Sequence, residues 1–286
     1  MKKVYLVLVL VVATIASYAQ ADSIKHWKFK GVNSLNFSQV SFSNWASGGE
    51  NSVALNLLLN YDANYKKGTF TWNNNIILGY GLTRQGDEKT KKSDDRIDFS
   101  SKMGWQTGEH WSFSGLFTFK TQFAKGYKYP EKEYMSNLFS PAFFTLGLGM
   151  DYKPSKHFSL LMAPLSMKMT VVSDDELVEN YGIDEGKNSR AEMGASVKAM
   201  FEKEVLTNVT LKSKLELFTN YLDHPEKIDM TWDVMVNMKI NKYLATNFVV
   251  NMAYDDDVKT VDDGGVKGGP TIQYKQLLGV GLSYSF

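Results

Sequence analysis

The chain has 286 residues, 43% of them hydrophobic and 22% charged, and a formal net charge of +1. It contains no cysteine, which excludes disulfides, thiolate metal sites, a cysteine nucleophile and a lipid-acylated cysteine. No basic patch stands out, so nucleic acid is not an expected partner. Aromatic residues make up 13% of the chain and there are 6 prolines, a balance that favours strands.

The N-terminus has the pattern of an export signal. Lys2 and Lys3 precede the apolar run V-Y-L-V-L-V-L-V-V-A-T-I-A, and the small residues of S-Y-A-Q follow. This pattern predicts a signal peptide over residues 1–19, with a cut after Ala21 as the alternative. An uncleaved anchor is disfavoured because the run is short for a membrane span. Cleavage leaves a short N-terminal segment, residues 20–26, and removes two lysines, so the mature net charge becomes about −1.

From residue 27 onward, apolar and polar side chains alternate, which is the pattern of strands with two different faces. Two long alternating segments flank K-K-G at residues 66–68 and predict a hairpin. Similar segments recur to the C-terminus and give about 12 strands within residues 27–286. Each segment has roughly ten residues or more, which is enough to cross a bilayer when the strand is tilted.

The connections between these segments alternate in length. The short ones lie near residues 66–68, 106–110, 153–157, 204–207 and 240–242. The others, mostly longer, lie near residues 39–50, 84–94, 125–140, 173–189, 223–226 and 255–269. Short turns at one end, long loops at the other and an even strand count are typical of a transmembrane β-barrel.

We therefore predict an all-β fold: one antiparallel transmembrane barrel with short periplasmic turns, long outer loops and both termini in the periplasm. A soluble β-sandwich is the alternative, but its strands are usually only about five or six residues long. In hydrocarbon an unpaired backbone group costs several kcal/mol, so a sheet there must close on itself. Aromatic residues near strand ends suit the two interfacial girdles: Tyr65, Trp72, Trp105, Trp111, Tyr152 and Tyr254.

The chain finishes on Q-L-L-G-V-G-L-S-Y-S-F, in which apolar residues occupy every second position. The last strand of a barrel must pair with the first, so a chain that finishes as a strand fits closure. The segment resembles the C-terminal recognition strand of bacterial outer-membrane proteins, which implies recognition by the barrel-assembly machinery during insertion. The residues that carry this resemblance are Leu278, Val280, Leu282, Tyr284 and Phe286.

A second resemblance lies in F-S-N-W-A-S-G-G-E-N-S, residues 42–52. It resembles the N-W-x-x-G-G-x-N-S motif near the first hairpin of an uncharacterised family of outer-membrane barrels, a domain of unknown function. The resemblance implies the barrel fold and carries no catalytic residue. Read physically, the two glycines permit a tight loop, and the motif either shapes that loop or contacts a ligand. The motif residues are Asn44, Trp45, Gly48, Gly49, Asn51 and Ser52.

The inward-facing positions carry charges of both signs. An isolated charge inside a barrel is costly, so we expect pairing across neighbouring strands. About 12 strands give a lumen between that of an eight-stranded barrel and that of a 16-stranded porin, which long side chains could nearly fill. The predicted lumen-lining residues are Arg96, Asp98, Lys102, Lys120, Lys168, Arg190, Glu192, Lys198, Glu202, Lys212, Lys214, Glu216, Asp229 and Asp233.

Catalysis finds little support, and no catalytic residue, cofactor or metal is expected. His26, His110 and His157 fall at the periplasmic end, whereas His224 follows Asp223 in an outer loop. That Asp-His pair leaves an outer-membrane hydrolase as a remote alternative. Acidic loop residues lack EF-hand spacing, so solvated loops near lipid headgroups are favoured over a calcium site. These residues are Asp174, Asp175, Glu176, Asp255, Asp256, Asp257, Asp262 and Asp263.

The sequence thus predicts a non-enzymatic protein of the Gram-negative outer membrane, surrounded by lipid. The first hypothesis is a narrow channel or transporter for small polar solutes. The second is a structural or assembly subunit that binds another envelope protein through its turns or loops. Mixed charge in the lumen fits both, because it suits a wet channel as well as a plugged scaffold.

Overall fold

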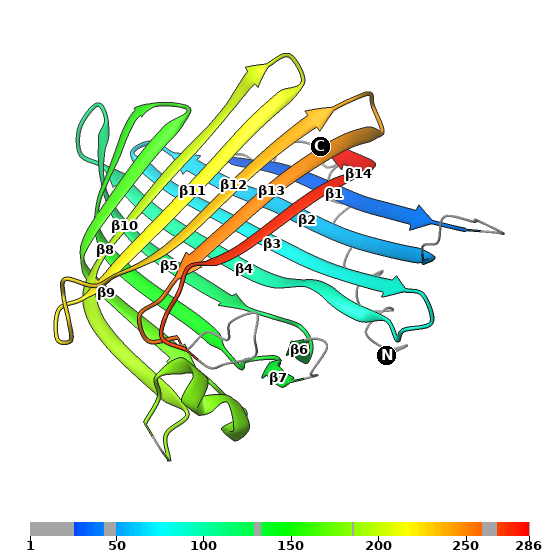
Figure 1. The fold of residues 1–286 in the computed structure, drawn as a ribbon. Coiled ribbons are helices and arrows are strands. Elements are labelled where there is room, and N and C mark those ends of the chain that lie inside the picture. The colour runs from blue at the N-terminus through cyan, green and yellow to red at the C-terminus, as the bar shows by residue number, and fades with distance from the viewer. Residues whose placement is uncertain (1–25, 43–49, 129–132, 185, 259–267, 286) are drawn as a thin grey trace.

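The computed structural model describes residues 26–42, 50–128, 133–184, 186–258 and 268–285. Twelve strands close into one antiparallel barrel in the order β1-β14-β13-β12-β11-β10-β9-β8-β5-β4-β3-β2 (Figure 1). The barrel strands are β1 Trp27–Val40, β2 Ser52–Lys67, β3 Phe70–Gln85, β4 Lys91–Gln106, β5 Trp111–Thr121, β8 Ala142–Ser155, β9 Phe158–Val171, β10 Ser189–Leu206, β11 Val209–Asn220, β12 Ile228–Lys239, β13 Leu244–Tyr254 and β14 Gln273–Ser285. The predicted strand count and the antiparallel barrel are confirmed.

The apolar face of the strands points outward. Leu55 is 41% exposed, Leu146 54% and Leu278 67%, although a sandwich would bury such residues between its sheets. A closed sheet with an exposed apolar surface satisfies its backbone groups internally and offers that surface to hydrocarbon. The chain is therefore a transmembrane β-barrel, and the side of the membrane on which its termini lie stays a prediction.

Aromatic side chains gather at the short-turn end of the barrel, as expected for a girdle. The ring of Trp27 lies 5.2 Å from that of Tyr65 and 5.6 Å from that of Trp72. Farther along the same end, Trp111 lies 4.7 Å from Tyr152, ring centre to ring centre. Amphipathic rings at this level are typical of a membrane interface.

The long-loop end contains structure that the alternation pattern did not predict. The connection between β5 and β8 includes a small hairpin of β6 Gly126–Lys128 and β7 Glu133–Ser136. The connection between β9 and β10 includes the 3₁₀ helix η1 Asp175–Tyr181, which lies with the hairpin at the bottom of Figure 1. Both segments were expected to be loops, because neither is long enough to show a period in sequence.

A compact apolar cluster holds this end together, and we call the hairpin, η1 and the cluster the loop cap. Val172, Leu177, Val178 and Ile183 are buried against one another, with Tyr134 and Tyr181 packed on them. The Asp174 side chain accepts a hydrogen bond from the Glu176 backbone N–H and caps η1. Asp174, the first of the acidic residues in this loop, therefore has a structural role as the cap of η1.

The connection between β3 and β4 is shorter than predicted. β3 continues to Gln85 and β4 begins at Lys91, so the turn spans residues 86–90 rather than 84–94. The start of β4 carries several charges on its inner face, and strand positions of this kind resemble a loop in sequence. Among the described residues, no helix is long and apolar enough to cross a bilayer.

Candidate functional site

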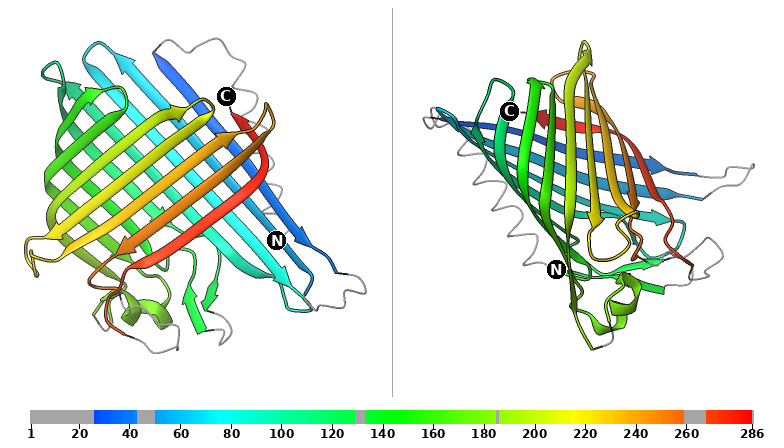
Figure 2. Two further views of the ribbon diagram at one scale, coloured as in Figure 1. Left: turned by 45° about the horizontal axis from the view of Figure 1, so that its top comes forward. Right: turned by 90° about the vertical axis from the view of Figure 1, so that its left-hand side faces the viewer.

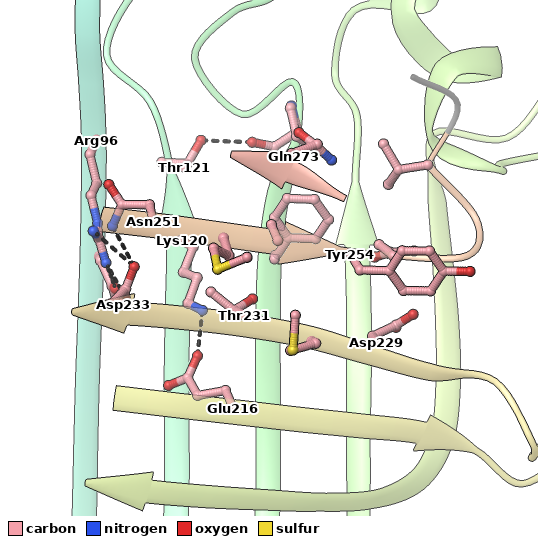
Figure 3. Close-up of a pocket in the computed structure, with 18 of the residues that line it drawn as sticks. Arg96, Lys120, Thr121, Glu216, Asp229, Thr231, Asp233, Asn251, Tyr254 and Gln273 are labelled. Carbon is pink, nitrogen blue, oxygen red and sulfur yellow. Dashed lines mark hydrogen bonds and ion pairs between the residues drawn. The ribbon is translucent and has the colours of Figure 1, made fainter. Parts of the chain in front are cut away.

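A cavity of about 820 Å³ lies in the lumen at the long-loop end, and we call it the vestibule. Its wall comes from β4, β5 and the strands from β8 to β14, and the loop cap contributes Tyr127, Met135 and Tyr181. Charged residues of both signs line it, and apolar side chains such as Phe143, Met230 and Met252 lie between them. Figure 3 shows part of this wall, with Arg96 directed toward Asp233 and Lys120 toward Glu216.

Seven charged residues meet in the lumen, and all but Lys214 line the vestibule. Arg96 Nη2 lies 2.7 Å from Asp98 Oδ2 and 2.8 Å from Asp233 Oδ2. Lys214 Nζ lies 2.8 Å from the same Asp98 oxygen. We call this set the central network; it consists of Arg96, Asp98, Lys120, Lys198, Lys214, Glu216 and Asp233.

Several of these ion pairs join opposite walls rather than neighbouring strands. Arg96 lies on β4 and Asp233 on β12, and five strands separate them whichever way the ring is followed. Lys120 of β5 pairs with Glu216 of β11, and three strands lie between them by the shorter route. The expectation of pairing between neighbouring strands is therefore wrong for these contacts, because the lumen is narrow enough for long side chains to meet across it.

Two members of the network are buried, and the side chains of the other five are partly exposed. Asp98 is 2% exposed and Lys198 is 5% exposed, yet both have ionic partners. Lys198 Nζ also donates a hydrogen bond of 2.8 Å to the Ser100 hydroxyl. Buried charges of this kind are tolerated only when they are paired and hydrogen-bonded, so each member depends on the others.

A second group, the Lys168 cluster, lies closer to the loops. Lys168 Nζ is 2.5 Å from Asp229 Oδ2, 2.6 Å from Asp255 Oδ2 and 3.8 Å from Glu192 Oε2. Its position among three carboxylates keeps the lysine charge compensated although the residue is buried. Asp255 was expected on a solvated surface loop, so this placement is a correction: the chain after β13 turns into the barrel mouth.

Arg190 and Asp257 extend this cluster. Arg190 Nη2 lies 3.0 Å from Glu192 Oε2 and 2.8 Å from Asp257 Oδ2. Asp256, between the two inward aspartates, instead pairs with Lys227 at 2.6 Å on the outer side. The acidic run after β13 is thus divided between the lumen and the surface, while Asp262 and Asp263 lie outside the described residues.

The remaining predicted lumen charges lie nearer the short-turn end. Lys102 Nζ is 2.8 Å from Asp151 Oδ2, and Lys153 Nζ is 3.1 Å from the same oxygen. Lys212 pairs with Glu202 at 3.2 Å. All fourteen predicted lumen charges take part in ion pairs, but they form separate groups along the barrel rather than one site.

Sequence reasoning missed several inward polar residues. Asp94 pairs with Lys275 of β14 at 2.5 Å and accepts a hydrogen bond of 3.2 Å from the Asn56 side chain. Asp94 had been placed in a loop, and its lysine partner is 181 residues away in the sequence. Asp151 was missed too, although its alternation with glycines on β8 was a usable signal.

The candidate hydrolytic pair lies on the surface. His224 is in the connection between β11 and β12, with its Nε2 3.7 Å from Asp223 Oδ1 and its Nδ1 3.1 Å from Glu226 Oε1. His110 and His157 occupy turns at the opposite end of the barrel. The described geometry brings His224 together with carboxylates of its own loop.

Two predicted recognition segments are described in part. In the loop motif, the Asn51 side chain accepts a hydrogen bond of 2.7 Å from the Phe42 backbone N–H, whereas Asn44, Trp45, Gly48 and Gly49 lie outside the described residues. In the C-terminal strand, four apolar side chains are exposed on the outer face: Leu278, Val280, Leu282 and Tyr284. Phe286 lies outside the described residues, and recognition by the assembly machinery stays a prediction.

Comparison with known proteins finds a family model that matches part of the chain. Residues 37–127, less than half of the chain, match the model of a family described as proteins of unknown function, DUF3078. This agrees with the resemblance to an uncharacterised barrel family. No curated protein matches the chain by sequence.

Solved structures similar to this chain include channels and porins. An outer membrane channel from Pseudomonas putida F1 is 11% identical with a TM-score of 0.40, covering 93% of this chain and 100% of that one. The NanC porin is 8% identical with a TM-score of 0.40, covering 88% and 98%. The TodX monoaromatic hydrocarbon channel is 9% identical with a TM-score of 0.30, covering 91% and 90%. Likeness at this level assigns no function to this chain. The protein is a transmembrane β-barrel, and residues 37–127 of it match a family of unknown function.

Proposed function

We propose that this barrel is a narrow, gated channel for small polar solutes. The vestibule receives the solute from the loop end, and the central network forms the constriction. The observation that carries the proposal is a cavity of about 820 Å³ whose wall includes ion pairs that cross the lumen. Its volume lies in the range of about 300–1,000 Å³ that is usual for small-molecule sites.

The chemistry of the wall supports a polar solute. Carboxylates, ammonium groups and side-chain amides line the vestibule, and Asn251 donates a hydrogen bond of 2.5 Å to Asp233. A solute with donors and acceptors replaces such contacts one at a time, whereas an apolar solute leaves them unpaired. Because charges of both signs alternate on the wall, the channel favours neither cations nor anions strongly.

The central network supports gating rather than free diffusion. Passage requires Arg96 to leave Asp233, or Lys120 to leave Glu216, for the lifetime of the solute in the constriction. Breaking a buried pair without replacement costs several kcal/mol, so a solute that offers its own charged or polar groups lowers the barrier. The wild-type channel should therefore have a small conductance with brief openings.

A structural or assembly role is the second candidate, and one observation favours it. The same ion pairs brace opposite walls, which suits a rigid, sealed scaffold as well as a gate. A scaffold needs no wet path through the network. Neither role involves catalysis, and the surface position of His224 offers the hydrolase alternative no enclosed site.

Single-channel recording in planar bilayers distinguishes these roles. The double variant R96A/D233A removes one cross-lumen pair together with both of its charges, and we expect its conductance to rise several-fold over wild type. The control D184A/K187A removes an exposed pair of 2.8 Å in the loop between η1 and β10 and should leave conductance unchanged. Heat-modifiable gel mobility verifies that each variant is folded. Absence of conductance in both wild type and R96A/D233A would refute the channel and favour the scaffold.

A further inference from the structure

The seam that closes the barrel is shorter than the other strand pairings. β1 and β14 are in register over five residue pairs, from Val32 with Ser285 to Asn36 with Gly281. Each other pair of neighbouring barrel strands is in register over ten or more residues. Figures 1 and 2 show β14 and β1 side by side near the C-terminus and then diverging toward the loop end.

The register of the paired part continues without obstruction in the sequence. One step beyond Asn36 and Gly281, Phe37 would face Val280, and two residues further Gln39 would face Leu278. In the structure, residues 37–40 have their register partners on β2. The described part of β14 from Gln273 to Val280 is paired with β13 but not with β1.

Apolar side chains flank this unpaired stretch on both strands, and we call them the apolar lips of the seam. Phe37 is 57% exposed on one side, and Val280 and Leu278 are 52% and 67% exposed on the other. Unpaired backbone groups facing hydrocarbon cost several kcal/mol, so an open seam persists only if polar groups lie close behind it. The vestibule supplies such groups, because Gln273 and Lys275 of β14 are part of its wall.

Polar side chains reach the inner edge of the seam. The ion pair of Lys275 and Asp94 spans from β14 to β4, past β1, β2 and β3. The Lys275 side chain is 42% exposed and lines the vestibule, whereas the Asp94 side chain behind it is 10% exposed. A cation and an anion side by side match the charges of a zwitterionic headgroup.

Asn36 marks the point where the pairing stops. The residue is 7% exposed, and neither side-chain nitrogen nor oxygen has a hydrogen-bond partner among the described residues. It lies against Gly279 and Gly281, where an added Cβ would be 2.7 Å from Asn36 Cγ and 2.1 Å from the Leu35 carbonyl oxygen, respectively. A buried amide without partners is costly, and it is placed where a polar group passing through the seam could bond to it.

We infer that the β1–β14 seam opens sideways at the loop end and admits single-chain amphiphiles with a zwitterionic head from the membrane into the vestibule. The head lies near Lys275, Asp94 and Asn36, and the alkyl chain passes between the apolar lips into lipid. The closed state adds the register pairs from Phe37 with Val280 to Val40 with Leu277. This inference goes beyond the solute channel and requires only the barrel and its vestibule.

Engineered disulfides test the seam cleanly, because the natural chain has no cysteine. Q39C/L278C joins the unpaired part, and L35C/L282C is the matched control in the paired part. The two pairs are four residues apart on each strand, so both have the same position relative to the ladder hydrogen bonds and both face outward. The protein is placed in phosphatidylcholine vesicles that contain lysophosphatidylcholine with a photoreactive head.

The readout is labelling of Thr231, which lines the vestibule, relative to its neighbour Trp232, which is 40% exposed on the outer face. We expect Thr231 to be labelled in wild type and in oxidised L35C/L282C. In oxidised Q39C/L278C, labelling of Thr231 should fall at least tenfold and return on reduction, while Trp232 labelling stays constant.

Three results overturn the inference: no labelling of Thr231 in wild type, equal labelling in oxidised and reduced Q39C/L278C, or oxidation of this pair as fast as that of L35C/L282C. If Q39C/L278C does not oxidise at all, the seam is always open and the wild-type labelling of Thr231 decides. Conductance of ions through the same variants is recorded separately. If no ions are conducted but the labelling of Thr231 still depends on the seam, the channel proposal fails and the seam inference stands. Conductance without seam-dependent labelling shows the reverse.

Discussion

The middle of the lumen and the β1–β14 seam differ in what holds them together. In the central network, side chains from opposite walls meet, and Arg96 reaches Asp233 at 2.8 Å across the barrel. At the seam, two neighbouring strands are in register over only five residue pairs. The backbone ladder between β1 and β14 is short, so it joins the two ends of the sheet weakly. The ion pairs that cross the lumen hold the walls on either side of this seam together, so closure of the barrel depends partly on side chains.

The largest effect is expected when one charge of the central network is removed. Asp98→Ala leaves Arg96 and Lys214 with fewer buried partners. We expect the free energy of unfolding to fall by about 3–5 kcal/mol, as is usual when one partner of a buried ion pair is removed. Urea unfolding in lipid vesicles measures this loss.

The control for that variant is D184A, at an exposed ion pair in the loop after η1. It should change stability by no more than about 0.5 kcal/mol. Equal stability of Asp98→Ala and wild type would mean that the network does not brace the barrel.

A second prediction concerns the loop cap, which neither the network nor the seam supports. Leu177 is 1% exposed in its apolar cluster, so Leu177→Ala should lower the local stability of the cap by about 2–5 kcal/mol. Protease cleavage within residues 173–188 should rise by roughly tenfold or more, because the local opening becomes more populated. Urea unfolding of the barrel should not change, and a parallel loss there would show that cap and barrel form one cooperative unit.

A third prediction weakens the seam itself. In Gly281→Ala the added Cβ would lie 2.1 Å from the Leu35 carbonyl oxygen, so β1 must shift away from β14. Stability should fall by about 1–3 kcal/mol, which is usual for overpacking. Gly115→Ala is the matched control, since its Cβ would lie 3.4 Å from Leu148 Cδ2, an ordinary contact. The folded fraction on heat-modifiable gels measures both, and equal behaviour of the two variants would argue against close approach at the seam.

The smallest expected effect concerns pH and the loop cap. A hydrogen bond from the Tyr134 hydroxyl lowers the pKa of Asp174 below its usual 3.8, and the Glu176 backbone N–H adds to this. Because the folded-state pKa is the lower one, the stabilisation is present above about pH 3.8 and is lost as the pH falls further. Hydrogen exchange at Leu177, corrected for intrinsic rates, should therefore speed up in acid.

Asp174→Asn should abolish that pH dependence, whereas Asp175→Asn should preserve it. An unchanged acid response in Asp174→Asn would assign it to another group.

Much of the barrel was readable from local alternation. Residues such as Leu55 and Leu278 were assigned outward from the two-residue period, and the structure exposes them. The loop cap was not readable, because Leu177, Val178 and Ile183 form a cluster only after β6, β7 and η1 come together. Asp94 was misassigned because its side chain is charged at a strand position whose partner lies far away in the sequence.

The sequence by itself predicted the fold class and the number of strands, from the export signal, the strand lengths, the unequal connections and the strand at the C-terminus together. Alternation divided the side chains of each strand between two faces, since this follows from the geometry of one extended segment. Tertiary structure alone decided which charges meet and where the ring is weakest. Arg96 and Asp233 are 137 residues apart, and they meet only because the closed ring places β4 opposite β12. The seam likewise depends on how two strands from opposite ends of the chain approach each other, which neither strand encodes separately.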